Sequence, residues 1–218
     1  MATVRAHFHY LDSHGHLHYV RDVKGIVGDS KHATCTESLC NRAFLDFFYL
    51  RLQHSDVAHV ALCSKFVHDE EGGKLLLDDD TTITPQKIVD HFPYVSICGP
   101  ELNFLKVEDA PVVFTGHCLD HPKFEQQTGV LTFAESLQEP LRPDALSITR
   151  EGKLLHPITK LKGLIRTNSD GEEAAPLGLV APQVGDKLGL RFNIEGYEKG
   201  GSYVIHWKGQ QQVIPYAD

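Results

Sequence analysis

Histidines recur at every second position in FHYLDSHGHLHYV, residues 8–20, on both sides of a Ser-His-Gly segment. Side chains of a β-strand alternate between two faces, so this pattern predicts a hairpin whose histidines gather on one face. A two-residue turn at His14-Gly15 is favoured because glycine adopts a positive φ without strain. His9 and His18 would then be diagonal neighbours, and two imidazoles with a carboxylate form a workable zinc set.

We interpret this histidine-rich face as a solvated or partly packed polar surface without a metal ion, with His9 and His18 as the candidates if one binds. A zinc site needs ligands that further contacts orient, and the pattern alone does not supply those contacts. His117-x-x-x-His121 has the spacing of helical zinc ligands, but the proline after it favours a loop. No cofactor is predicted.

A second group of chemically capable residues lies in CGPELNFLKVEDAPVVFT, residues 98–115. Cys98 could act as a nucleophile beside a thiolate-stabilising histidine, or could be a small buried apolar side chain. Glu101, Asn103 and Asp109 could line a ligand pocket, or could hold turns by bonding the local backbone. The sequence has no phosphate-binding glycine loop, G-x-S-x-G elbow or H-E-x-x-H pair, so standard hydrolase, kinase and metalloprotease functions are unsupported.

The same segment carries a resemblance to a known family. C-G-P-E-L-N-F followed by D-A-P-V-V-F-T is similar to a C-G-x-E-x-N-[FY]...D-x-P-V-V-F-T motif of an uncharacterised eukaryotic family, a domain of unknown function. The opening hairpin and GKLLHP, residues 152–157, also resemble that family. The resemblance implies no activity, because none is assigned to the family, and it implies a mitochondrial location for some members.

Composition limits the class of protein. The net charge of −8 argues against general binding of nucleic acid or of an anionic membrane surface, both of which attract Lys and Arg. No apolar run approaches the roughly 18–20 residues of a membrane span. Five cysteines without a CxxC pair indicate thiols in a reducing compartment, either cytoplasmic or mitochondrial.

The apolar pattern of residues 34–53 predicts one long amphipathic helix. Thr34 and Glu37 fit a capping box at its start, and Phe44 and Phe47 are expected to face the core. Further expected elements are a strand or helix at 57–67, a short helix at 84–92, a helical turn at 140–146, a hairpin at 147–157, and a three-stranded meander at 188–216. Residues 98–115 should enter a hairpin that turns at 108–111, with Phe104 and Phe114 buried.

These elements predict an α+β fold with a mainly antiparallel sheet built from hairpins, one long amphipathic helix and short helices. Residues 1–218 are expected to form a single domain with exposed loops near 69–82 and 167–176. The predicted function is that of a soluble, non-enzymatic binding or assembly protein for an unknown protein or small molecule. The alternative is an enzyme of unidentified type, with a site around Cys98–Asn103 and Glu101 as general acid or base.

Overall fold

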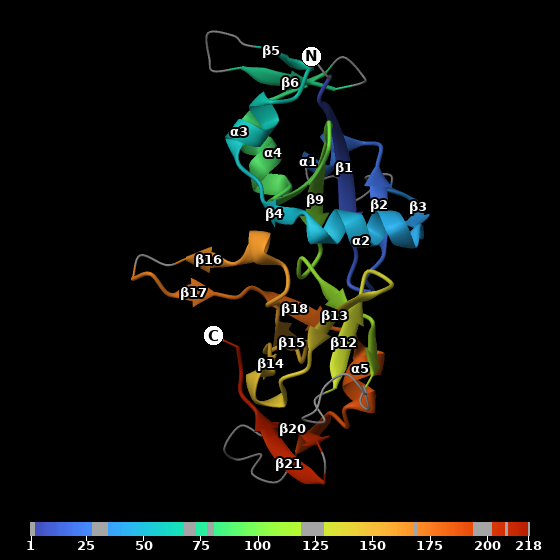
Figure 1. The fold of residues 1–218 in the computed structure, drawn as a ribbon, viewed down its shortest axis with the longest axis vertical. Coiled ribbons are helices and arrows are strands. Elements are labelled where there is room, and N and C mark those ends of the chain that lie inside the picture. Colours follow the sequence, from blue (N-terminus) through green and yellow to red (C-terminus); the bar gives the residue numbers. More distant parts are fainter. Residues whose placement is uncertain are drawn as a thin grey trace. The chain divides into compact units, whose positions relative to one another are not determined.

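The computed structural model describes residues 3–27, 35–67, 73–77, 81–118, 129–167, 170–193, 202–207 and 209–217 (Figure 1). The chain forms two compact units. Unit 1 comprises Met1–Asp12, His16–Glu108 and Leu161–Leu164, and unit 2 comprises Ser13–Gly15, Asp109–Lys160 and Ile165–Asp218. The expectation that the chain is a single domain stays a prediction.

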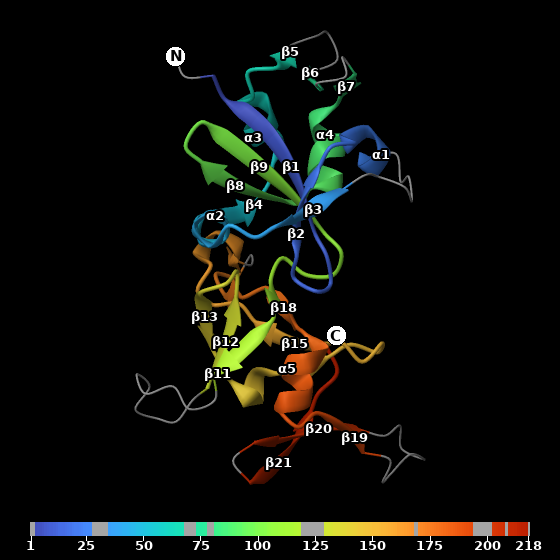
Figure 2. The ribbon, with the colours of Figure 1, turned by 90° about the vertical axis from the view of Figure 1, so that its right-hand side faces the viewer.

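Unit 1 is built on a six-stranded sheet with the order β3-β2-β1-β9-β8-β4. Its strands are β1 (Arg5–Leu11), β2 (Leu17–Val20), β3 (Cys35–Leu39), β4 (Leu52–His54), β8 (Tyr94–Cys98) and β9 (Glu101–Val107). The central pair is parallel, with Arg5 of β1 opposite Glu101 of β9, and the remaining pairs are antiparallel. Figure 2 shows β1, β9 and β8 running side by side.

Helices contact both faces of this sheet. The core on one face joins Phe8, Val95 and Phe104 of the strands to apolar side chains of α1 (Val23–Val27), α3 (Val57–Ala61) and α4 (Pro85–His91). The other face carries α2 (Arg42–Leu50), whose Phe48 ring lies 5.4 Å from the ring of His9. The short strands β5 (Phe66–Val67), β6 (Lys74–Leu76) and β7 (Thr82–Ile83) form a separate small sheet of unit 1.

The predicted fold class is wrong. Within the described residues the chain is strand-rich, with 44% strand and 22% helix, and its strands form several small sheets. Only two of the five α-helices in these residues reach seven residues, so the described part of the chain holds no long amphipathic helix. The sheet of unit 1 is also centred on a parallel pair, which hairpins alone cannot make.

The segment 34–53 shows why the long helix does not form. Cys35–Leu39 pairs with β2 as a strand, and the helix begins only after Asn41, whose Oδ1 accepts a hydrogen bond from Phe44 N at 3.0 Å. Thr34 lies outside the described residues. The helix α2 buries Leu45, Phe48 and Tyr49. The apolar pattern therefore runs through β3, α2 and β4 in turn, and not along one face of a single helix.

The first hairpin forms with a different register. His9 lies opposite Tyr19 rather than Val20, because five residues, Asp12 to His16, separate the strands instead of a two-residue turn. Gly15 does adopt a positive φ, at 89°. A shift of one residue moves a strand's side chains to the other face, so His9 and His18 lie on opposite faces of the sheet.

The described residues of unit 2 form four small sheets. They have the orders β10-β18-β15-β14, β11-β12-β13, β16-β17 and β19-β20-β21. The strands are β10 (Val113–Phe114), β11 (Gly116–Cys118), β12 (Val130–Phe133), β13 (Leu137–Pro140), β14 (Ser147–Ile148), β15 (Leu154–Pro157), β16 (Arg166–Thr167), β17 (Glu173–Ala174), β18 (Leu177–Val180), β19 (Arg191–Asn193), β20 (Ser202–Trp207) and β21 (Gln210–Ile214). Its one α-helix in the described part of the chain is α5 (Pro182–Lys187).

Several local predictions are confirmed. The short helix at 84–92 is α4, the helical turn at 140–146 is a 3₁₀ turn at Pro143–Ala145, and the hairpin at 147–157 and the meander at 188–216 form as expected. Segment 57–67 holds α3 and then β5. The predicted loop at 69–82 contains β6 and buried Leu75, and that at 167–176 contains β17; residues 68–72, 78–80, 168 and 169 lie outside the described residues.

Candidate functional site

The residues singled out around Cys98 lie in a tight hairpin of unit 1. Cys98 ends β8 and Glu101 begins β9, directly opposite each other across Gly99-Pro100. Gly99 has φ 64°, a conformation that glycine adopts without steric cost. Glu101 and Asn103 therefore project from strand β9. The predicted hairpin with its turn at 108–111 is wrong, because β9 and β10 belong to different sheets. Phe104 and Phe114 are fully buried, as predicted.

Asn103 belongs to a buried hydrogen-bond network on the α2 face of the sheet. Its Nδ2 donates to the carbonyl of Ser96 at 3.3 Å, and its Oδ1 lies 3.1 Å from His9 Nε2. The Ser96 hydroxyl donates to the Phe48 carbonyl of α2 at 2.7 Å. Because Nδ2 faces a carbonyl, Oδ1 must accept, and the neutral imidazole carries its proton on Nε2. Both ends of the amide are satisfied, which favours the structural role for Asn103.

His9 is held neutral by the same environment. Burial lowers its pKa to about 4, although the hydrogen bond to Asn103 acts in the opposite direction. Its ring packs edge-on against Tyr19 and Phe48. His9 is therefore a core side chain that joins β1, β9 and α2, and not part of a solvated face.

Glu101 bonds to side chains rather than to local backbone. Its Oε1 accepts a hydrogen bond from Arg5 Nη2 at 2.6 Å and lies 3.8 Å from His7 Nε2. The parallel pairing of β1 with β9 produces this contact, since Arg5 lies opposite Glu101. The carboxylate is therefore an ion-pair partner at the end of the sheet, with a histidine close by.

Replacing Glu101 by Gln should have a small effect on folding. The Arg5 side chain is 61% exposed and that of Glu101 is 33% exposed, and such pairs contribute at most about 1 kcal/mol. We expect the free energy of unfolding in urea to change by less than that amount. A loss above roughly 2 kcal/mol, the range for a disrupted buried hydrogen bond, would show that the carboxylate has a buried structural role.

The other two candidates, Cys98 and Asp109, do not line the cavity described below, and each has a polar partner that is not a histidine. Cys98 is half-buried, and its one hydrogen-bond partner in the described part of the chain is the Ser96 hydroxyl at 3.3 Å. Asp109 is the first residue of unit 2 after β9, and its carboxylate forms an ion pair with Lys153. Three histidines are possible thiolate partners of Cys98: His91 bonds the Lys87 carbonyl, and His117 of β11 and His156 of β15 belong to unit 2.

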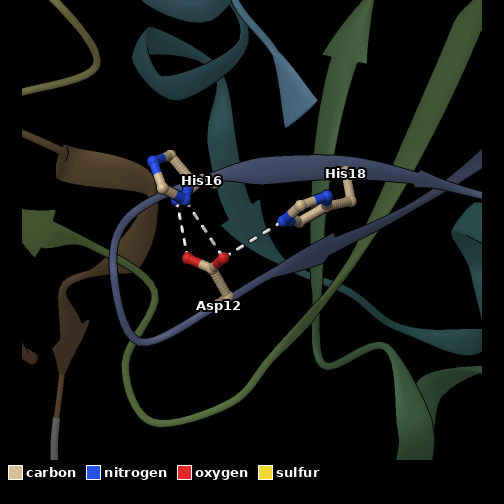
Figure 3. Close-up of side chains that lie close together, drawn as sticks. All are labelled: Asp12, His16 and His18. Carbon is tan, nitrogen blue, oxygen red and sulfur yellow. Dashed lines mark hydrogen bonds and ion pairs between the residues drawn. The ribbon is translucent and has the colours of Figure 1, made fainter. Parts of the chain in front are cut away.

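A cluster of potential metal ligands lies at the end of β1. Figure 3 shows the Asp12 carboxylate between the rings of His16 and His18. Oδ2 lies 3.3 Å from His16 Nδ1 and 3.1 Å from His18 Nε2, and the three potential ligand atoms lie within 4.8 Å of one another. Asp12 and His18 are part-buried, whereas the His16 side chain is 60% exposed.

A cavity of about 490 Å³ lies at the opposite end of β1, within unit 1. Its walls come from four segments: residues 4–8, 19–24, 63–65 and 75–77. They place apolar side chains of the core beside basic side chains, and they include His7. The combination of apolar walls with a few charged groups is typical of small-molecule sites.

Two buried polar groups of unit 2 have structural contacts. The Glu139 carboxylate accepts hydrogen bonds from the backbone amides of Thr159 and Lys160, at 2.9 and 3.0 Å, and from the Thr159 hydroxyl. His156 Nε2 accepts from Arg142 N at 3.0 Å, so Nδ1 carries the proton and donates to the Pro157 carbonyl at 2.8 Å. Burial lowers the pKa of His156 to about 4. His121, the second residue of the predicted helical pair, lies outside the described residues.

The comparisons with known proteins define a family. A family model described as Domain of unknown function (DUF4505) matches residues 77–216, which include the C-G-P-E-L-N-F hairpin and all strands from β8 to β21. The chain belongs to this DUF4505 family, which agrees with the resemblance to an uncharacterised family. No solved structure matches the chain. No helix in the described ranges is both long enough and apolar enough to span a membrane.

Sequence reasoning missed the role of Asp12. The pattern D-x-x-x-H-x-H, residues 12–18, is visible in the chain, but a two-residue turn would have placed Asp12 and His18 on opposite faces. The longer connection allows the carboxylate to reach both rings. The cavity had no sequence signal, because its walls come from four separated segments.

Proposed function

We propose that this protein is a non-enzymatic binding protein whose ligand is a small organic anion with an apolar group. The observation that carries the proposal is the cavity of unit 1. Its volume of about 490 Å³ lies within the range of roughly 300–1,000 Å³ found for small-molecule sites. Charge and surface type in the cavity then specify the class of ligand.

The charged groups of the cavity favour an anion. Among the described residues, Arg5, Arg21, Lys24 and Lys65 line it, against a single carboxylate, Asp22. That carboxylate accepts a hydrogen bond from Gly25 N at 2.7 Å, and Arg5 is paired with Glu101. Arg21 and Lys24 make no ion pair within the described residues. In a chain of net charge −8, this local excess of positive charge attracts an anionic ligand.

The remaining walls favour an apolar group on the same ligand. Phe8, Val20, Val23 and Leu75 are core side chains that also line the cavity. Burial raises the pKa of the Cys63 thiol, another lining residue, to about 11, so it adds no negative charge at neutral pH. A molecule with a carboxylate, phosphate or sulfonate beside an aromatic or aliphatic group satisfies both kinds of surface.

The anionic dye 1-anilinonaphthalene-8-sulfonate tests this proposal, since it combines a sulfonate with aromatic rings. We expect one saturable site by fluorescence titration and calorimetry. Arg21→Ala with Lys24→Ala should weaken binding by at least about tenfold, because each charge-assisted hydrogen bond contributes roughly 1.5–3 kcal/mol. Affinity should also fall as salt screens the remaining charges.

The matched control is Arg42→Ala with Lys87→Ala. It removes the same two charges from exposed positions of unit 1 that do not line the cavity. Dye affinity in this variant should stay within about twofold of the unchanged chain, since exposed charges that do not contact the ligand are screened by salt. Equal losses in both variants, or dye binding that does not saturate, would count against a specific anion site.

Catalysis by unit 1 is the second candidate, with Glu101 as general acid or base. One observation favours it: His7 lines the cavity, and its Nε2 lies 3.8 Å from Glu101 Oε1. A carboxylate beside an imidazole can transfer protons to a bound molecule. The Glu101→Gln variant distinguishes the two candidates. If Glu101→Gln binds a ligand as the unaltered chain does but no longer converts it, the enzyme is supported. If both proteins bind the ligand equally and neither converts it, the binding protein is supported.

We further propose a small-molecule or protein partner, no nucleic-acid or membrane partner, and a reducing compartment, cytoplasmic or mitochondrial. The acidic net charge supports the exclusion of polyanions. Cys40, Cys63, Cys98 and Cys118 are thiols in the structure, which supports the compartment. The C-G-x-E-x-N-[FY] motif at residues 98–104 supports a eukaryotic origin for the family.

A further inference from the structure

We propose that Asp12, His16 and His18 form a binding site for a divalent transition-metal ion of the zinc type. In tetrahedral zinc sites with bonds of about 2.0–2.1 Å, neighbouring ligand atoms are about 3.3 Å apart. Asp12 Oδ2 lies 3.3 Å from His16 Nδ1 and 3.1 Å from His18 Nε2, which matches that spacing (Figure 3). On binding, a metal ion would take the place of the hydrogen-bonding protons between the Asp12 carboxylate and the two ring nitrogens.

The hairpin holds the ligands in place before any ion binds. Asp12 Oδ1 accepts a hydrogen bond from the backbone amide of His16 at 2.8 Å, which orients Oδ2 toward the rings. The Asp12 amide donates to the His16 carbonyl at 3.1 Å and closes the loop. On the neighbouring strand, the His18 ring lies 6.3 Å from that of Tyr10. Such supporting contacts are the feature that raises metal affinity above that of isolated histidines.

Ligand type and exposure specify the ion further. Two imidazole nitrogens with one carboxylate suit Zn²⁺ and similar ions, whereas Mg²⁺ and Ca²⁺ prefer oxygen ligands alone. The Asp12 and His18 side chains are 20% exposed and that of His16 is 60% exposed. Solvent therefore reaches the cluster, and a bound ion would keep at least one coordination position for water or for an external ligand.

The cluster is separate from the proposed anion cavity. The cavity lies along residues 4–8 at the start of β1, and Asp12 follows the last residue of that strand. None of the three ligands lines the cavity. The metal site and the anion site can therefore be tested independently of each other.

The test uses the full chain without a polyhistidine tag, stripped with a chelator and titrated with Zn²⁺ by calorimetry at pH 7.5. We expect one equivalent to bind, with a dissociation constant in the micromolar range or below, and no comparable heat with Mg²⁺. His16→Ala and His18→Ala should each weaken Zn²⁺ binding more than about tenfold, since even loss of a supporting contact costs 10–100-fold. Asp12→Asn keeps the acceptor for the His16 amide but removes the charge, and should also weaken binding.

His14→Ala is the matched control, because it removes a histidine from the same loop that is not in the cluster. It should leave Zn²⁺ affinity unchanged. Titration of the unaltered chain with Co²⁺ needs no variant, and the intense visible absorption of a four-coordinate ion is expected. No stoichiometric Zn²⁺ binding, equal loss in His14→Ala, or binding that persists in His18→Ala would show an adventitious ion only and overturn the proposal.

Discussion

Phe48→Ala should lower the free energy of unfolding by about 3–5 kcal/mol, the range for removing a buried aromatic ring. The Phe48 side chain is fully buried between α2 and the sheet of unit 1. Its ring packs 5.4 Å from His9, 5.5 Å from Tyr49 and 5.9 Å from Phe44. The truncation would leave a cavity in the layer that also holds the Asn103 network.

Phe47→Ala is the matched control for this experiment. Phe47 is the adjacent residue of the same helix, but it is 40% exposed, and the Arg51 guanidinium lies 3.5 Å over its ring. An exposed cation–π contact contributes about 0.5–1 kcal/mol, so the loss should be of that size. Urea denaturation followed by far-ultraviolet circular dichroism measures both variants. Comparable losses would mean that α2 is rotated relative to the orientation in this structure.

Acidification should destabilise the chain through His9 and His156 before its carboxylates are fully protonated. Each has a folded-state pKa of about 4 because it is buried, against an ordinary value of 6.5. Between these two values the unfolded chain binds a proton that the folded chain does not. The stabilisation from each neutral histidine is fully present above pH 6.5 and is lost as the pH falls toward 4; at pH 5 the loss amounts to about 2 kcal/mol for each histidine.

Unfolding measured at pH 7.5 and pH 5.0 tests this expectation. His9→Gln and His156→Gln should each reduce the difference between the two pH values by about 2 kcal/mol, since glutamine does not titrate. His206→Gln is the control, because the His206 side chain is exposed. Titration of the ring resonances by nuclear magnetic resonance provides a second measurement on the unaltered chain. A ring pKa above 6 for either buried histidine would contradict its burial in a neutral form.

Local signals in the sequence predicted the elements that local contacts stabilise. Pro85 after Thr84 marked the start of α4, because proline suits the first turn of a helix. Gly152 marked the turn of the hairpin at 147–157, where it has φ 84°. Phe104 and Phe114 were expected to be buried, and both are. Pro85 and Gly152 favour particular backbone conformations, and phenylalanine is strongly favoured in a protein core.

The predictions for α2 and the first hairpin were wrong where more than one arrangement fitted the pattern. Apolar residues at helical spacing continued from Leu39 to Leu52, although β3 ends at the first and β4 begins at the second. The histidine alternation predicted a hairpin but not its register, and one residue of slip moved His18 away from His9 and beside Asp12. Loop length decided which residues could form a site.

The sequence by itself determined family membership, α4, and in unit 2 the 3₁₀ turn at Pro143–Ala145, the hairpin at 147–157 and the meander at 188–216, because these depend on residues close together along the chain. Only the tertiary structure decided the parallel pairing of β1 with β9, whose paired residues are nearly a hundred positions apart. That pairing brings Glu101 to Arg5 and Asn103 to His9. The cavity likewise brings together β1 and three further segments that are separated from it in the sequence. Parallel strands need a long crossover, and a crossover leaves no local pattern from which its end point can be read.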